Sequence, residues 1–511
     1  MRTEIPLESL QKENDQLQNN IVLLQHENSY LKEQVEWFRR QIFGQKSERS
    51  VPEQTIENEY IKLIVDDTGK EYKEEKSQEI PAHKRKKRNK TGNRTIEPPA
   101  DLPVERHIID IPENEKICAE TGKPLVKIGE EVTKKLAVKP QQYFIKEIVR
   151  PKYALPKGSE GGISIAPLPE SLLTRCFADE SFLANILVQK YGDHLPLYRI
   201  EEILFRNKIK ISRQVLCKWV ARCGAALAPL CDVMKAKIFE SANAFIDETP
   251  IGLQDPGKGK LKQAYMWVLV GGKERAPPYR IYNFFTNRKH DNANAILDGY
   301  KGVLHSDKYG AYEKIGKKEY ITWCPCWAHI RRKFFEAESG DPLFRKWILR
   351  KIRYLYMFEK VAWNRNEEER LRIRQEKEGP IIDEIISKVK NRLLEGKVLP
   401  KSKFSVALGY IINLIPHLKG YTSDAWAHID NNVAERAIRP LAIGRKNWLF
   451  IGSEASGKSA AVIISLIQTC RGLGVNPRDY LEDVMRRLMS HSYQKLHELL
   501  PDHWAKKKGL I

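Results

Sequence analysis

The stretch "AFIDETPIGLQ", residues 244–254, carries one aspartate, Asp247, in the middle of an otherwise apolar, strand-like run. Two more strand-like runs follow, "AYMWVLVGG" (264–272) and "YRIYNFF" (279–285), and three such runs in succession predict an antiparallel meander. The chain continues with a helix-like "NANAILDGY" (292–300) and with "KGVLHSDKYGAY" (301–312), whose strand ends at Asp307. The next piece, "YITWCPCWAHIRRKFFEAE" (320–338), predicts a strand that runs into a basic helix.

The predicted order of these elements, β-β-β-α-β-α-β-α, is that of the ribonuclease H fold. In that fold two acidic side chains from neighbouring strands face each other, and here they would be Asp247 and Asp307. The sequence therefore predicts a multidomain α/β protein with a ribonuclease H-like domain at residues 241–452.

A third carboxylate is expected from a helix near the two aspartates. The best candidate is Glu435, about one turn into a helix capped by Asp430 or Asn431. Carboxylates suit Mg²⁺ or Mn²⁺, and a pair of such ions activates water or a hydroxyl for phosphodiester chemistry. We therefore predict that Asp247, Asp307 and Glu435 are the catalytic and metal-binding residues. Asp430 competes with Glu435 for the third place, and Glu248 competes with Asp247 for the first.

The charge balance favours a polyanionic partner. The 511 residues include 87 Lys and Arg against 66 Asp and Glu, a net charge of +21, which is typical of nucleic-acid-binding proteins, although basic membrane-surface proteins share it. Beside the acids, basic residues that would bind backbone phosphate are Arg332, Lys333, Arg436, Arg439, Arg445 and Lys446.

Residues 169–240 read as helical. A helix at about 197–207, a short break and a second helix after Ser212 predict a helix-turn-helix-like DNA-binding region. The second helix would present Arg213, Gln214 and Lys218 to DNA. Paired short helices are common in proteins, so a purely structural role is the alternative.

The ends of the chain have different compositions. Residues 1–45 repeat leucine every seven residues, and Asn14 and Asn28 at core positions favour a parallel leucine-zipper dimer over a single amphipathic helix. Residues 46–100 form a basic polar linker with its densest charge at 83–94, residues 101–168 predict a small β module, and residues 453–511 predict a C-terminal helical segment.

Two motifs point to other chemistry. Cys324, Cys326 and His329 resemble a metal-binding triple, but without a fourth ligand nearby the pattern disfavours zinc. "GSEASGKS" (452–459) matches the P-loop pattern of nucleotide-binding proteins letter for letter. A P-loop domain also needs a downstream Walker B strand, which the amphipathic helical pattern after Ser459 does not supply, so we expect a loop that leads into the last helices.

Four longer stretches, "FIDETPI", "LHSDKYGAY", "CWAHIRRKFFE" and "DNNVAERAIRPLAIGRKNWLFIGS", resemble the transposases of the insertion sequence 66 family, and "QIFGQKSE" and "GDHLPLYR" add to the resemblance. The similarity runs over nearly the whole chain. It implies a DDE transposase with two divalent ions held by Asp247, Asp307 and Glu435, and a helical insertion at about 338–420. The family's four-cysteine zinc module would be degenerate here, because only Cys118 remains in place.

The resulting expectation is a cytoplasmic DNA transposase that acts on the terminal inverted repeats of its element and on target DNA. It would dimerise through residues 1–45 and act with accessory proteins of the element. No apolar run in the sequence is long enough to span a membrane. The alternatives are a catalytically inactive DNA-binding protein derived from a transposase and a P-loop NTPase that acts on DNA.

Overall fold

The computed structural model describes residues 142–153, 164–241, 243–255, 259–271, 278–338 and 340–510. The predicted coiled coil (1–45), the basic linker (46–100), Cys118 and most of the predicted β module lie outside these residues. Of the β module, two short antiparallel strands are described, β1 (Lys152–Tyr153) and β2 (Ser164–Ile165).

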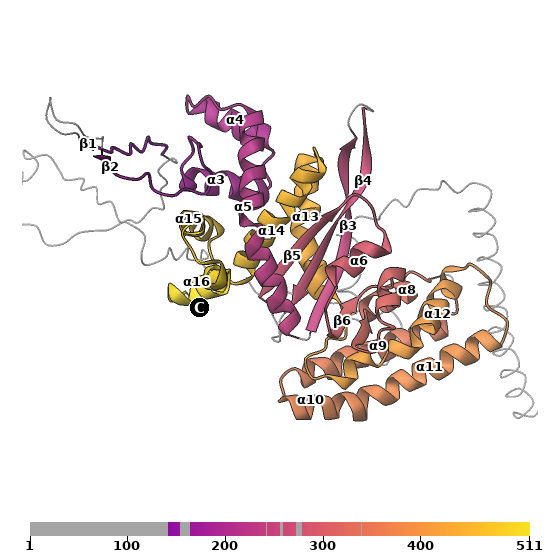
Figure 1. Cartoon of the computed structure of the whole chain (residues 1–511). Helices are drawn as coiled ribbons and strands as arrows, with labels where there is room; N and C mark the ends of the chain where they lie inside the picture. The colour runs from indigo at the N-terminus through magenta and orange to yellow at the C-terminus, as the bar shows by residue number, and fades with distance from the viewer. Residues whose placement is uncertain are drawn as a thin grey trace, which may run out of the picture. The chain divides into compact units, whose positions relative to one another are not determined.

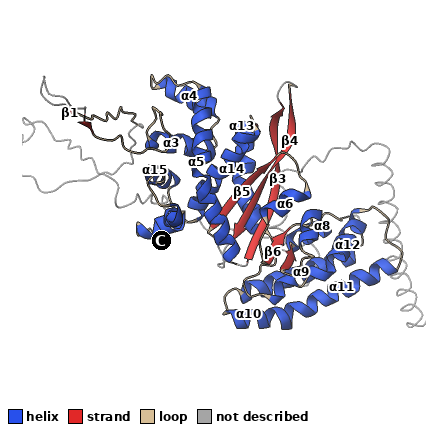
Figure 2. Ribbon diagram, in the orientation of Figure 1, coloured by secondary structure: helices blue, strands red, loops and turns tan. Residues whose placement is uncertain are grey.

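A mixed β-sheet forms the centre of residues 164–510, and its strands lie in the order β5-β4-β3-β6-β7 (Figures 1 and 2). β3 pairs antiparallel with β4, and β4 pairs antiparallel with β5, whereas β3, β6 and β7 run parallel. The strands are β3 (Asn243–Asp255), β4 (Lys260–Gly271), β5 (Tyr279–Phe285), β6 (Gly302–Ser306), β7 (Ile321–Pro325) and the short β8 (Phe450–Ile451), which pairs with the far end of β3.

The helices near the sheet follow the expected order. Those before it are α3 (Glu180–Tyr191), α4 (Leu197–Arg206) and α5 (Arg213–Glu240); those between its strands are α6 (His290–Ile296) and α7 (Gly310–Ile315); and α8 (Trp327–Phe335) follows β7. The predicted meander, the helix after it, the strand that ends just before Asp307 and the strand that runs into a basic helix are all confirmed.

Two helices cover opposite faces of the sheet. The face with Phe245, Asp247 and Thr249 carries α13 (Asn432–Trp448), because Arg445 of α13 donates to Thr249 Oγ1 at 2.8 Å. The opposite face carries α5, whose Ile238 lies where a side chain at Gly271 would be. Since successive side chains of a strand point to opposite faces, Asp247 lies on the α13 side.

The helix α14 (Glu454–Gly472) covers the open edge of β5. The N–H group of Tyr282 donates to Ser465 Oγ at 2.8 Å, and the N–H group of Arg280 donates to Thr469 Oγ1 at 3.1 Å. These hydroxyls satisfy edge groups that would otherwise be open to another strand. α14 is thus packed onto the sheet, and α15 (Pro477–Arg487), η5 (Tyr493–Leu499) and α16 (Pro501–Lys507) follow it.

The segment between α8 and α13 is helical throughout its regular elements, as expected for an insertion at about 338–420. Its elements are α9 (Pro342–Ala362), α10 (Glu367–Ile373), η2 (Arg374–Glu378), α11 (Gly379–Leu394), α12 (Lys403–Leu414), η3 (Ile415–His417) and η4 (Gly420–Ser423). Figure 1 shows α9, α11 and α12 beside one another, and α12 also packs on α8.

A buried arginine ties this insertion to the segment that leads into α13. Arg374, in the π-helical turn η2, makes a two-pronged ion pair with Glu359 at 2.6 and 2.9 Å. It also donates to the carbonyls of Tyr421, Asp424 and Ala427 at 3.2, 2.6 and 2.8 Å. The insertion therefore holds the backbone of residues 421–427.

Among the described residues, no helix is both long and apolar enough to cross a membrane.

Candidate active site

Asp247 lies on β3, and Asp307 directly follows the neighbouring parallel strand β6. The register pairs Phe245 of β3 with His305 of β6, and each aspartate comes two residues after its member of that pair. Phe245 and His305 stack with ring centroids 4.3 Å apart, so both point to the same face. Adjacent strands are about 4.8 Å apart. Asp307 therefore follows the neighbouring strand at the level of Asp247, close enough for its charge to act on Asp247.

The start of α13 is fastened to the sheet beside Asp247. Asn431, the residue before the first turn, donates from its side-chain amide to the carbonyl of Ile246 at 2.9 Å. Its own N–H group bonds Cys326 Sγ at 3.2 Å, at the start of α8. Asn431 thus occupies the N-cap position that was expected for it or for Asp430, but its side chain bonds the sheet and not the helix. These contacts bring Glu435, in the first turn of α13, to the same region.

The electrostatics of the aspartates reflects this crowding. Burial raises the pKa of Asp247 well above its usual range, and the negative charges of Asp307, Glu248 and, least of all, Glu435 add to the rise. Burial and the charge of Glu248 raise the pKa of Asp307 to about 6, although Arg288 opposes the change. Such mutual repulsion is relieved by a cation, and hard oxygen donors of this kind fit Mg²⁺ or Mn²⁺.

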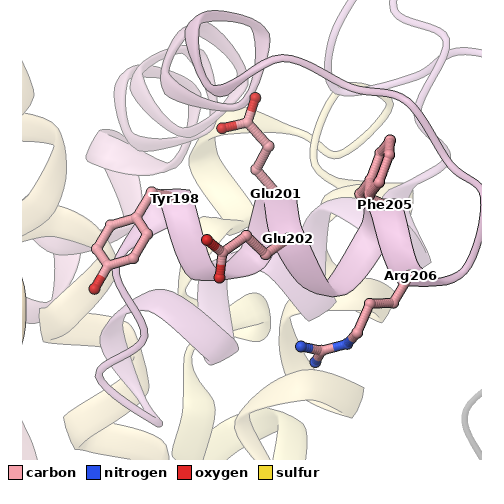
Figure 3. Close-up of a pocket in the computed structure, with 5 residues that line it drawn as sticks. All are labelled: Tyr198, Glu201, Glu202, Phe205 and Arg206. Atoms are coloured by element: carbon pink, nitrogen blue, oxygen red, sulfur yellow. The ribbon is translucent and has the colours of Figure 1, made fainter.

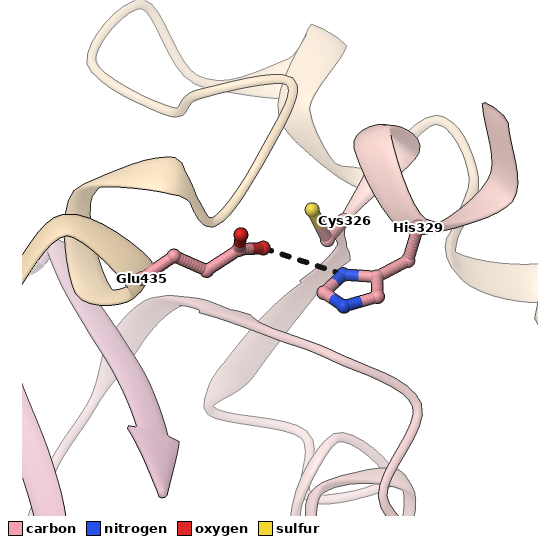
Figure 4. A group of neighbouring side chains, drawn as sticks. All are labelled: Cys326, His329 and Glu435. Atoms are coloured by element: carbon pink, nitrogen blue, oxygen red, sulfur yellow. Dashed lines mark ion pairs between the residues drawn. The ribbon is translucent and has the colours of Figure 1, made fainter. Parts of the chain in front are cut away.

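The carboxylate of Glu435 turns toward α8. Its Oε1 lies 3.5 Å from Nδ1 of His329, and its Oε2 lies 4.0 Å from Arg332. Figure 4 shows the Glu435 side chain extending from α13 toward His329, with Cys326 beside it. In the sequence, Cys324, Cys326 and His329 resemble a metal-binding triple. The structure instead groups Cys326 and His329 with Glu435, while Cys324 lies near Gly420.

The competing acids are held by other partners. Glu248 points to the opposite face of β3, where Nε of Arg288 donates to it at 2.7 Å and the hydroxyl of Tyr312 also donates to it. Asp430 accepts bonds from the backbone and side chain of Asn432. Arg288 and Tyr312 were missed from the sequence, where only their positions, shortly after β5 and on the helix that follows Asp307, could have suggested a role.

The basic residues predicted near the acids occupy two helices. Arg332 and Lys333 lie on α8, whereas Arg436, Arg439, Arg445 and Lys446 lie on α13. Arg332, Arg436, Arg439 and Lys446 are exposed. Arg445 is half-buried, and its guanidinium bonds Thr249 and the carbonyl of Pro250, so it fastens α13 to β3. The exposed cations of α13 form a stripe at helical spacing that starts next to Glu435.

The predicted helix pair is present as α4 and α5. Ser212 stands at the N-cap of α5 but does not cap it with its side chain; Oε1 of Glu201 accepts the N–H group of Arg213 at 3.0 Å. Arg213, Gln214 and Lys218 are exposed at the start of α5. On α4, a shallow pocket is lined by Tyr198, Glu201, Glu202, Phe205 and Arg206 (Figure 3). Its two carboxylates make that face a poor partner for phosphate.

The P-loop match is not a phosphate-binding loop. Residues 454–459 already belong to α14, which Ser453 and Ser456 cap reciprocally, so the expected loop is wrong beyond Ser453. A side chain at Gly457 would collide with Phe284, Lys458 pairs with Glu454 at 2.9 Å, and Ser459 donates to the carbonyl of Ala221. This geometry contradicts the P-loop NTPase alternative, because the backbone N–H groups of Gly457 to Ser459 lie within a helix.

Comparison with known proteins gives a consistent result. Residues 175–459 match the family model described as "Transposase IS66 family", and residues 465–501 match the "IS66 C-terminal element". A third model, "Transposase C of IS166 homeodomain", matches residues 30–106.

Similar curated proteins come from Sinorhizobium fredii. The uncharacterized protein y4qI is 34% identical over 391 residues, which cover 74% of this chain and 71% of that protein. The uncharacterized protein y4hP is 32% identical over 501 residues, which cover 92% of this chain and 88% of that protein. With a family model that matches more than half of its length, the chain belongs to the IS66 family of transposases.

Proposed function

We propose that the protein is a DDE transposase whose sheet and flanking helices form a ribonuclease H-like domain. The proposal rests on the pairing of Phe245 with His305, each two residues before its aspartate, and on the contact of Asn431 with Ile246, which brings the start of α13 and Glu435 to the same region. The order of strands and helices and the helical insertion before Glu435 support the same fold. The reaction would be cleavage of DNA at the ends of the element and transfer of the strand to a target.

Asp247 and Asp307, together with Glu435, would hold two Mg²⁺ or Mn²⁺ ions. When bound, the ions supply Lewis-acid stabilisation of the attacking and leaving oxygens of the phosphodiester. The protein's own part would be to hold the carboxylates in place: Asn431 fastens α13 to β3, and the pairing of β6 with β3 would keep Asp307 near Asp247. The pKa of each aspartate is raised, so a bound cation would stabilise the ionised form of both carboxyls by neutralising their repulsion.

DNA would be bound along two basic surfaces. The exposed residues of α8 and α13, Arg332, Arg436, Arg439 and Lys446, would contact phosphates near the acids. Arg213, Gln214 and Lys218 of α5 would contact DNA at a separate position. The active assembly would contain a second copy, joined through residues 1–45, and accessory proteins of the element.

The second candidate is a DNA-binding protein without catalysis. The orientation of Glu435 favours this second candidate, because its carboxylate faces the His329 imidazole of α8. The first candidate requires the Glu435 side chain to turn from His329 toward the aspartates, on a helix whose start is fastened beside Asp247.

A cleavage and strand-transfer assay tests the proposal. The substrate is DNA that carries the element's own ends, incubated with Mg²⁺ or Mn²⁺ and without ATP. Wild type is compared with Asp307→Asn, which removes a charge at the site, and with Asp298→Asn, which removes a charge from an exposed loop. DNA binding of all three is measured by electrophoretic shift.

We expect metal-dependent products from wild type and Asp298→Asn and none from Asp307→Asn, with DNA binding unchanged. Products that survive in Asp307→Asn would show that the acids are wrongly assigned. DNA binding by wild type without any product would favour the inactive DNA-binding protein.

A further inference from the structure

A cluster of mixed ligands lies next to the proposed catalytic acids. Cys326 Sγ, a ring nitrogen of His329 and a carboxylate oxygen of Glu435 all lie within 4.8 Å of one another (Figure 4). Cys326 stands just before α8 and His329 lies one turn into it, so a spacing of three residues puts both on one side of the helix start. Glu435 reaches them from α13.

Two atoms of this cluster are buried without a hydrogen-bond partner. They are Nδ1 of His329 and Oε1 of Glu435, which face each other at 3.5 Å. Such atoms are costly unless something binds them. Imidazole nitrogens and carboxylate oxygens are both common ligands of transition metal ions.

The distances match a transition metal. In a tetrahedral Zn²⁺ site with ligands at about 2.0–2.3 Å, ligand atoms lie about 3.3–3.7 Å apart. The 3.5 Å between His329 and Glu435 falls in this range, and the sulfur needs to move by no more than about 1 Å. A thiol and an imidazole favour Zn²⁺ or Co²⁺ over Mg²⁺, which takes oxygen ligands.

The surroundings support a metal-bound thiolate. The backbone N–H group of Asn431 points to Cys326 Sγ at 3.2 Å, and the N–H group of Trp327 bonds the carbonyl of Ile429 at 3.2 Å. The first contact is of the kind that stabilises a coordinated sulfur, and the second joins the start of α8 to the segment before α13. The three ligands are therefore held together by backbone contacts before any ion binds.

We propose that Cys326, His329 and Glu435 form a binding site for one Zn²⁺ or Co²⁺ ion, with the fourth position left to water. On binding, the Cys326 thiol releases its proton to solvent and the thiolate bonds the ion. The sequence pattern disfavoured zinc because Cys324, Cys326 and His329 are only three ligands in one short stretch. In the structure, the carboxylate of Glu435 from another helix takes the place of Cys324.

The site shares Glu435 with the proposed catalytic metal site. An ion bound to Cys326 and His329 holds the Glu435 carboxylate on the α8 side, so Zn²⁺ would oppose the Mg²⁺-dependent reaction. This consequence rests on the proposed function, whereas binding of the ion does not.

The test is a titration of the full-length chain with Co²⁺ in excess Mg²⁺, followed by the thiolate-to-cobalt charge-transfer absorption. Cys326→Ser and His329→Gln are compared with Cys324→Ser, which removes a buried thiol outside the cluster, and circular dichroism confirms that each variant is folded. We expect the band in wild type and Cys324→Ser, its loss in Cys326→Ser, and at least about tenfold weaker binding in His329→Gln.

A folded wild type with no thiolate band, or a band that persists in both Cys326→Ser and His329→Gln, would overturn the proposal. His329→Gln keeps the proposal testable if Cys326→Ser does not fold, because the His329 side chain is less buried. DNA cleavage in Mg²⁺ by a chain that does not bind Co²⁺ would refute this site and leave the proposed function standing. Co²⁺ binding by a chain that does not cleave DNA in Mg²⁺ alone, with no Co²⁺ present, would do the reverse.

Discussion

Replacing Arg374 by methionine is expected to loosen the segment that leads into α13. The side chains of Arg374 and Glu359 are 0% and 4% exposed, so water cannot solvate either group when the other is removed. Methionine fills much of the same volume but carries no charge and no donor. The variant therefore leaves the Glu359 carboxylate buried without its cation, and the carbonyls of Tyr421, Asp424 and Ala427 lose a donor.

The expected loss is large. Removing one partner of a buried ion pair costs about 3–5 kcal/mol. Each carbonyl that is left unsatisfied adds up to about 1–3 kcal/mol, less where water reaches it. As a comparison, Lys419→Met breaks the pair with Asp383, whose side chains are 45% and 62% exposed, and such pairs contribute less than about 1 kcal/mol.

Urea unfolding followed by tryptophan fluorescence measures the global effect, and Trp363, whose ring lies 5.5 Å from the Arg374 guanidinium, reports on the site. Hydrogen exchange of the amides of residues 421–431 measures the local effect. We expect faster exchange there and weaker DNA cleavage, because Asn431 and Glu435 follow this segment. A free energy of unfolding within about 0.5 kcal/mol of wild type would refute the reasoning.

Three further outcomes are expected. Burial, then the charge of Glu359, raises the pKa of Glu378 to about 8. The protonated carboxyl of Glu378 therefore stabilises the folded state fully below its unfolded pKa, and this stabilisation is lost as the pH rises toward 8. The free energy of unfolding of Glu378→Gln should thus depend less on pH between about 5 and 8 than that of wild type. Gly224→Ala should lower the melting temperature, because a Cβ there meets backbone atoms of α14 at 2.7 and 2.8 Å, whereas Gly409→Ala, in open space on α12, should raise stability by up to about 1 kcal/mol. Lys458→Ala should leave DNA cleavage unchanged and independent of ATP, since this side chain is 66% exposed. ATP-dependent cleavage by wild type that is lost in the variant would contradict the helical assignment of α14.

Local patterns predicted most elements of the sheet. β5 was placed at its observed bounds, and β3 within one residue at each end, because long apolar runs between turn-forming residues specify strands without help from the rest of the chain. Asp247 and Asp307 followed from the strands that carry them. The expectation that they face each other came from the ribonuclease H-like order of the strands, which puts β3 beside β6.

Long-range contacts could not be predicted in the same way. The position of Glu435 beside His329 depends on how α13 docks on α8, and the bonds from Asn431 that set this docking join residues far apart in the chain. Arg374 looks in the sequence like any basic residue of a surface helix, yet it is fully buried. The P-loop pattern is the opposite case, because the sequence of residues 452–459 matches a phosphate-binding loop that the structure does not contain. The packing of Gly457 against the sheet and of Ser459 against α5 places these residues in a helix.

The hydroxyls of Ser465 and Thr469, which close the open edge of β5, have a consequence for damaged gene copies. A stop codon or frameshift before α14 would produce a chain that keeps Asp247, Asp307 and Glu435 but exposes that strand edge to the edges of other molecules. Such a product is expected to aggregate and be degraded. Truncated copies would then not persist as inactive competitors for the ends of intact elements.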